Sequence, residues 1–399
     1  MGLLTGIRIL AVEQYGAGPF GTQALAELGA EVIKIENPRD GGDVTRSLGP
    51  FFDKDLGEGA ESLFFQALNC NKKSVALDLN SAEGQAVFHK LVAKADAVAC
   101  NLRGDVPGKL GLTYEKLGQV KKDIVCCHLT AYGRDGSRAN WPGYDYLIQA
   151  ECGYFYLNGE PDSSPSRFGL SIVDYATGYC LAIAVLAGIL DARRNGQGRD
   201  VDVSLADVGL ANLCYLAAWN LNRDYVPERV PRSGHPTLAP CQLFPTADGW
   251  IYIMANKEKF FPLLCDKLGR PDLGSDPRFS TFTLRLKNRA EMTTVLDPLF
   301  KQRTTDEWLQ AFAGAIPAAP VLPMAEALKA PFIAERGSVV DVESDSGTVL
   351  KMIGSPFRTG EPAPRRSAPP LGRDTDDMLE EAGYSNDSIA KLRQAGTVT

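Results

Sequence analysis

The chain has 399 residues, more than a single hydrophobic core usually supports, so its length predicts two domains. Its 42 Lys and Arg and 49 Asp and Glu residues give a formal charge of −7, which argues against general nucleic-acid binding but not against a local basic patch for an anionic ligand. The hydrophobic fraction of 44% and the charged fraction of 23% are those of a globular protein.

The first elements alternate between short apolar runs and helical patterns. Residues 7–13 predict a strand, a turn of small residues follows at 16–19, a helical pattern ends at Gly29, and residues 31–36 predict a second strand. A strand–helix–strand unit of this kind is typical of a parallel α/β sheet. The alternation continues with a helix capped by Ser81 and with strands expected at 73–79, 97–101 and 123–133.

A long apolar stretch at 175–190 is shorter than a bilayer span and is followed by charged residues, so it predicts a buried helix. The N-terminus lacks the basic and apolar regions of a secretory signal. We therefore expect a cytoplasmic protein without a membrane segment.

The Pro-rich segment 227–240 indicates a linker, after which the pattern changes. A strand–turn–strand is expected at 241–255 with Asp248-Gly249 in the turn, and Thr304 with Glu307 forms a capping box. Strands are expected again at 337–353, then two short helices, the second capped by Ser385. The predicted organisation is a large domain over 1–224, a small domain over 225–325, and a C-terminal return to the large domain over 326–399.

Neither the cysteines nor the glycine-rich turn predicts a cofactor site. The nine Cys are widely spaced without a CxxC pair, and there are only three His, so we expect reduced thiols and no metal. The turn GAGPF departs from G-x-G-x-x-G at Pro19 and Phe20, which opposes a dinucleotide-binding dehydrogenase.

Asp174 is the most informative polar residue, because it lies between a strand-like run and the long apolar helix. One interpretation is an ordinary helix N-cap. The other uses the same position for chemistry: an accessible carboxylate at a helix N-terminus could attack a substrate while nearby amides stabilise an oxyanion. The residues alone leave both interpretations open.

Several segments together resemble the class III CoA-transferase family, which also contains formyl-CoA transferase and α-methylacyl-CoA racemase. The resemblance spans nearly the whole chain and rests on the order of GIRILAVEQYGAGPF, NCNKKSVALDL, NLRGDVPGKLG, PGYDYLIQA and FGLSIVDYATG. It implies an α/β fold with a Rossmann-like large domain built from both chain ends, a smaller α+β domain, and an interlocked homodimer.

The resemblance also implies roles for individual residues. Asp174 matches the catalytic aspartate, which forms an aspartyl anhydride and then an aspartyl-CoA thioester. The implied CoA contacts are Asn69, Lys72, Asn101, Leu102, Arg103, Lys109, Tyr132 and Arg134. The implied substrate pocket contains Tyr15, Gly16, Ala17, Tyr144 and His235. Acyl-CoA enters as a substrate, no cofactor is permanently bound, and succinyl-CoA with a small dicarboxylate acceptor is the expected pair.

Departures from the family bear on specificity. Formyl-CoA transferase has Gln where this chain has Gly16, and SGHPTLAP replaces its glycine-rich lid, which argues against formyl-CoA and oxalate as the substrates. The racemase branch uses a His where this chain has Tyr144, a poor base at neutral pH. The transferase is therefore favoured over the racemase and over a CoA-binding protein without turnover.

Overall fold

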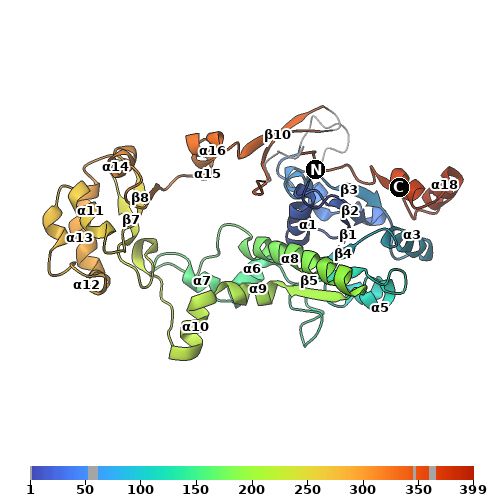
Figure 1. Ribbon diagram of the computed structural model, residues 1–399, viewed down its shortest axis with the longest axis horizontal. Coiled ribbons are helices and arrows are strands. Elements are labelled where there is room, and N and C mark those ends of the chain that lie inside the picture. The colour runs from blue at the N-terminus through green and yellow to red at the C-terminus, as the bar shows by residue number, and fades with distance from the viewer. Residues whose placement is uncertain (1, 53–61, 345–346, 359–364) are drawn as a thin grey trace. The chain divides into compact units, whose positions relative to one another are not determined.

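The computed structural model describes residues 2–52, 62–344, 347–358 and 365–399, which form two compact units (Figure 1). The first unit comprises 1–152, 169–214 and 331–399, so it contains both chain ends, and the second comprises 153–168 and 215–330. These boundaries differ from the expected ones, because 153–168 and 215–224 belong to the second unit. Arg229 accounts for part of this difference, since its guanidinium donates to the carbonyl oxygens of Phe155, Glu160 and Ser163.

The first unit is built on a six-stranded sheet whose neighbouring strands all run parallel. The strand order is β3-β2-β1-β4-β5-β6, the order of a Rossmann-type sheet, which confirms the predicted parallel α/β architecture. In such a sheet ligands bind beyond the carboxyl ends of the strands where the order reverses, here between β1 and β4. The strands are β1 (Arg8–Val12), β2 (Glu31–Glu36), β3 (Lys73–Ala76), β4 (Ala97–Cys100), β5 (Val125–Thr130) and β6 (Asp200–Ser204).

Helices pack on the sheet because its strands are apolar on both faces. Side chains such as Leu10, Ile33 and Val98 form one core with α3, α17 and α18. Helices α1 and α8 pack against each other and against β2 and β5. The helices of this unit are α1 (Ala17–Glu27), α2 (Leu63–Asn69), α3 (Ala82–Val92), α4 (Val106–Lys109), α5 (Tyr114–Leu117), α6 (Asp145–Glu151), α8 (Ile172–Asn195), α9 (Leu205–Asn212), α16 (Pro331–Glu335), α17 (Thr375–Glu381) and α18 (Asn386–Gln394).

Several local predictions are confirmed. Ser81 and Ser385 accept amide hydrogens at the starts of α3 and α18. The predicted strands at 337–353 form an antiparallel hairpin of β10 (Val339–Glu343) and β11 (Val349–Ile353). Within the described residues, α8 is the helix long and apolar enough to cross a membrane, but its Val173, Leu181 and Val185 are buried in the fold.

The second unit has its own core around an antiparallel sheet of β7 (Cys241–Pro245), β8 (Trp250–Met254) and β9 (Ala318–Pro320). Phe244, Phe300 and Trp308 pack together there. Asp248 and Gly249 lie in the turn between β7 and β8, and Thr304 with Glu307 forms the predicted capping box. The helices are α7 (Tyr154–Leu157), α10 (Cys214–Arg223), α11 (Phe260–Lys267), α12 (Phe282–Lys287), α13 (Arg289–Phe300), α14 (Thr305–Phe312) and α15 (Met324–Ala327).

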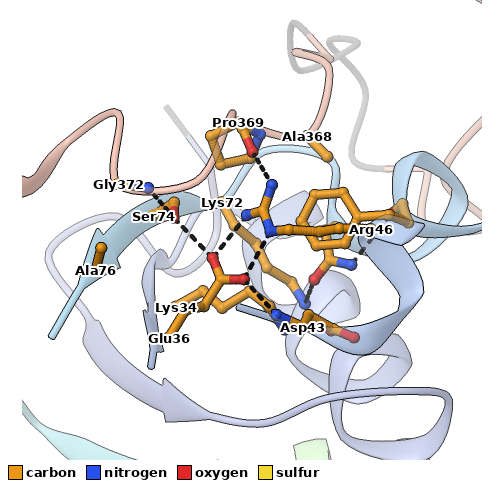
Figure 2. A network of polar contacts seen from close by, with 12 residues as sticks. Lys34, Glu36, Asp43, Arg46, Lys72, Ser74, Ala76, Ala368, Pro369 and Gly372 are labelled. Carbon is orange, nitrogen blue, oxygen red and sulfur yellow. Dashed lines mark hydrogen bonds and ion pairs between the residues drawn. The ribbon is translucent and has the colours of Figure 1, made fainter. Parts of the chain in front are cut away.

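A buried network of charged side chains joins the sheet to the C-terminal return. Figure 2 shows Arg46 donating to both carboxylate oxygens of Glu36 and to the carbonyl oxygen of Pro369. Ser74 donates to Glu36 and accepts from the amide of Gly372. Arg46 and Ser74, which both donate to Glu36, therefore hold the segment 369–372.

Lys34 lies in the same region with its side chain fully buried, 2.8 Å from Asp43 Oδ2 and 3.0 Å from the carbonyl oxygen of Glu13. Burial opposes its charge, but the carboxylates of Asp43, Glu13 and Glu36 outweigh burial and raise the pKa of Lys34. The ion pair is therefore maintained inside the fold.

We expect Lys34→Met to destabilise the protein by roughly 3–5 kcal/mol, because it leaves the buried Asp43 carboxylate without its cation. The matched control is Lys73→Met, which removes a half-exposed lysine paired with Glu31 and should change stability by less than about 1 kcal/mol. Chemical unfolding of both variants measures the difference. Equal effects would show that the buried pair contributes no more than a surface pair.

Candidate active site

A cavity of about 810 Å³ opens beyond the carboxyl ends of β1, β4 and β5. Its wall comes from four regions: 14–17 after β1, 101–103 after β4, 129–131 at the end of β5, and 141–146 leading into α6. Asp174 and Tyr175, from the first turn of α8, also line the cavity, as do Phe64, Leu68, Val106, Ser171 and Leu205. The cavity therefore lies at the reversal point of the strand order, where Rossmann-type sheets bind ligands.

Asp174 is not the N-cap of α8, which corrects the capping interpretation. Ser171 occupies the N-cap position, and Asp174 lies three residues later in the first turn. Among the residues that the structure describes, none donates a hydrogen bond to its carboxylate or pairs with it. Burial and the nearby negative charge of Asp145 raise the pKa of Asp174 to about 7. A carboxylate lining a cavity, with its pKa raised in this way, is typical of a reactive group.

Gly16 faces this carboxylate from the N-terminus of α1. A Cβ atom on Gly16 would overlap Asp174 Oδ2, so only glycine leaves room for the carboxylate in its observed position. The preceding residue, Tyr15, has a left-handed backbone with φ of 66°. The turn is held by Asn101, which bonds both the amide and the carbonyl of Gln14, and by Asp43, which accepts from the amide of Tyr15 at 3.2 Å.

The predicted CoA contacts fall into three groups. Asn101, Leu102 and Arg103 line the cavity, and Arg103 is the basic residue in that lining. Its side chain is about half exposed and lies 3.5 Å from Asp105, so it remains accessible to a phosphate or carboxylate. Asn101 lines the cavity, but its amide group is engaged by the Gln14 backbone.

Lys109, Tyr132 and Arg134 lie outside the cavity lining and bind acidic partners within the protein. Lys109 pairs with Asp105, Tyr132 donates to Glu151, and Arg134 pairs with Asp202 and Asp200. Lys109 and Arg103 share Asp105 as a partner, so these two cations lie near each other. The CoA contacts of Lys109, Tyr132 and Arg134 therefore remain predictions.

Asn69 and Lys72 point into the protein interior. Lys72 Nζ is fully buried and donates to Glu13 Oε1, to the carbonyl oxygen of Pro19 and to Asn69 Oδ1, all within 2.9 Å. Burial lowers the pKa of Lys72 to about 8, although Glu13 opposes this effect. Because both side chains are buried, this placement argues against direct CoA contact by Asn69 or Lys72. Both residues instead support the turn between β1 and α1.

Most of the predicted substrate pocket lies together. Tyr15, Gly16, Ala17 and Tyr144 line the cavity with Asp174, and the rings of Tyr15 and Tyr144 meet edge to face at 5.8 Å. His235 belongs to the second unit, where its Nε2 lies 3.2 Å from the hydroxyl oxygen of Tyr215. Its part in a substrate pocket remains a prediction.

Sequence reasoning missed Asp145. This residue follows Tyr144 in the PGYD segment, and its carboxylate is buried beside Asp174. The aromatic lining by Trp141, Tyr146 and Tyr175 was also not anticipated. The only available signal was the clustering of aromatic residues with an acid just before a helix, which by itself does not indicate a site.

A second arrangement resembles a nucleophilic triad but does not fit that role. Cys100 Sγ lies 3.3 Å from His128 Nδ1, and His128 Nε2 lies 2.7 Å from Asp200 Oδ1. Cys100 and His128 are both buried, and burial raises the pKa of the Cys100 thiol to about 12. His128 is thus a packed histidine in the buried strand β5. Within the described part of the chain, no three His, Cys, Asp or Glu side chains are grouped to hold a metal ion.

Comparison with known proteins agrees with this geometry. A family model described as CoA-transferase family III matches residues 4–375. Succinate–glutarate CoA-transferase of Agrobacterium fabrum is 33% identical over 95% of both chains, and acetyl-CoA:oxalate CoA-transferase of Acetobacter aceti is 32% identical over 93% of both. The crystal structure of a CAIB/BAIF family protein from Brucella suis superposes with a TM-score of 0.82 at 32% identity, over 96% of this chain and 99% of that one. These matches show that the chain belongs to CoA-transferase family III and is an acyl-CoA:carboxylate CoA-transferase.

Proposed function

We propose that Asp174 is the covalent carboxylate of this transferase. The supporting observation is the position of the Asp174 carboxylate, which lines the cavity beside the N-terminus of α1. Among the described residues, none donates a hydrogen bond to this carboxylate. The positive end of that helix favours negative charge that develops next to it. Arg103 is the group that we propose to bind an anionic part of CoA.

The reaction proceeds in two half-reactions. The Asp174 carboxylate attacks the donor thioester and expels CoA thiolate, which leaves a mixed acyl–aspartyl anhydride. The thiolate then attacks the aspartyl carbonyl carbon, releasing the donor acid and forming an aspartyl-CoA thioester. The acceptor carboxylate attacks this thioester and expels the thiolate again. The thiolate finally attacks the acceptor carbonyl of the second anhydride, which yields acceptor-CoA and restores Asp174.

The proposed substrates are succinyl-CoA as donor and a small dicarboxylate as acceptor, which agrees with the name of the Agrobacterium relative. The Acetobacter relative is named for oxalate at nearly the same identity, so overall identity does not choose the acceptor. Arg46 is buried and paired with Glu36, so this basic residue does not hold the second carboxylate of the acceptor. A homodimer and a cytoplasmic location complete the proposal.

To test this proposal, the protein is incubated in D₂O with succinyl-CoA, a 2-methylacyl-CoA and a pool of carboxylic acids. Every CoA thioester is then identified by mass spectrometry. A new thioester that forms as succinyl-CoA disappears supports the transferase and names the acceptor. Deuterium in the 2-methylacyl-CoA without any new thioester would replace the proposal with racemase chemistry.

Transfer should depend on pH through Asp174. Only the ionised carboxylate can attack a thioester, and the raised pKa of Asp174 means that this form is lost as pH falls through about 7. We therefore expect kcat/KM to rise about tenfold per pH unit below pH 7 and to level off above it. Initial rates measured between pH 5 and pH 9 test this expectation. A rate that stays constant down to pH 5 would contradict it.

A further inference from the structure

The carboxylate of Asp145 is buried and makes two specific contacts, neither of them with a cation. Its Oδ2 accepts the backbone amide of Asp174 at 2.9 Å, and its Oδ1 accepts Gln149 Nε2 at 2.5 Å. Gln149 also donates to the carbonyl oxygen of Leu170, just before α8. Among the described residues no Lys, Arg or His pairs with Asp145. Burying an uncompensated carboxylate is costly, so this position is not explained by stability alone.

The first contact fixes the main chain at the nucleophile. The amide of Asp174 lies in the first turn of α8, where backbone N–H groups have no partner within the helix. Asp145 supplies that partner from α6, 29 residues earlier in the chain. This bond holds the first turn of α8 in place, and therefore the direction in which Asp174 enters the cavity.

The second consequence is electrostatic. We propose that Asp145 is a positioning residue for Asp174, which orients the nucleophile through its amide and holds a second negative charge beside it. This inference rests on the proposed function, because it assigns Asp145 a part in the attack by Asp174. A like charge nearby favours the protonated form of a carboxylic acid and makes its ionised form a stronger base and nucleophile. Such a carboxylate comes closer in basicity to the thiolate that it must expel, since a free thiol has a pKa of about 8.5.

Asp145 is the acidic side chain beside Asp174 in the cavity lining, so its charge is the one that we expect to affect the pH dependence of kcat/KM. Besides Asp145 and Asp174 itself, the titratable side chains in the cavity lining are Tyr15, Tyr144, Tyr146, Tyr175 and Arg103. Helix α1 presents Gly16 and Ala17 there, and α9 presents Leu205. The negative charge of Asp145 is therefore the nearby side-chain charge that, after burial, raises the pKa of Asp174.

The test is Asp145→Asn, which keeps an oxygen able to accept the Asp174 amide and removes the charge. The acid limb of the kcat/KM profile should move to lower pH by about one unit, because burial, the larger cause of the raised pKa of Asp174, remains while the like charge of Asp145 is gone. The plateau rate at pH 9 should fall by up to about tenfold, since Gln149 then faces an amide group. Asp145→Glu should lower the plateau without moving the limb downward, because it changes the geometry and keeps the charge.

The matched control is Asp191→Asn, which removes a negative charge from the other end of α8, about 25 Å away along the helix. That variant should leave the profile unchanged, because the separation exceeds the screening length in physiological salt. Where Asn at position 145 prevents folding, Asp145→Ser removes the same charge with a smaller side chain, and the position of the acid limb is read from that variant.

An acid limb that does not move in a folded, charge-free variant would overturn this inference while leaving the proposed function intact. Absence of thioester exchange in the unmodified protein would instead reject the proposed function itself. The two failures are therefore distinguishable in one set of rate measurements.

Discussion

Asp174→Asn should reduce CoA transfer by about 10⁴-fold or more, because an amide cannot form the anhydride on which both half-reactions depend. The variant should fold normally and be at least as stable as the unmodified protein above pH 7. The sign follows from the raised pKa of Asp174. The unfolded carboxyl ionises at about pH 4 and the folded one at about pH 7, so the stability cost grows between these values and is complete above pH 7, and asparagine removes it. Rates of thioester exchange and thermal unfolding at pH 8 measure both effects.

An isotope experiment separates covalent chemistry from a merely structural role. When the acceptor carboxylate carries ¹⁸O, one labelled oxygen becomes the bridge of the second anhydride. This oxygen stays on Asp174 when the thiolate attacks the acceptor carbonyl and the Asp174 carboxylate is released. The peptide that contains Asp174 should therefore gain ¹⁸O during turnover and gain none without a donor thioester. An unlabelled peptide from an enzyme that is turning over would rule out Asp174 as the covalent group.

Gly16→Ala should lower kcat/KM by about 10²-fold, the loss associated with a displacement of about 1 Å at a reacting group. The added methyl group would overlap Asp174 Oδ2 and force the carboxylate out of its observed position. Backbone strain does not contribute, because Gly16 has φ of −96° and ψ of −75°, a region open to alanine. Kinetics with the established donor and acceptor test the prediction.

The matched control is Gly249→Ala in the turn between β7 and β8, where an added Cβ would meet only an ordinary contact with Thr305 Oγ1. This variant should retain full activity. Full activity in Gly16→Ala as well would mean that Asp174 does not react from the position beside Gly16.

The sequence alone predicted the elements whose signals are local. The parallel strands follow from short apolar runs between helical patterns. The caps at Ser81, Thr304 and Ser385 follow from side chains that accept from amides three residues away. The resemblance of ordered segments to a family placed Asp174 at the centre of the chemistry. The cavity residues 14–17 and 101–103 were also predictable, because they follow β1 and β4 in the chain.

Tertiary structure alone decided which polar side chains face the cavity. Lys72 and Arg103 are both basic residues in loop-like segments, yet Lys72 is buried against Glu13 while Arg103 lines the cavity. Asp145 meets the amide of Asp174 only because α6 packs against α8. Such contacts depend on how distant elements pack, and a pattern over neighbouring residues carries no information about that packing. The charge environment of the nucleophile is therefore a property of the folded chain.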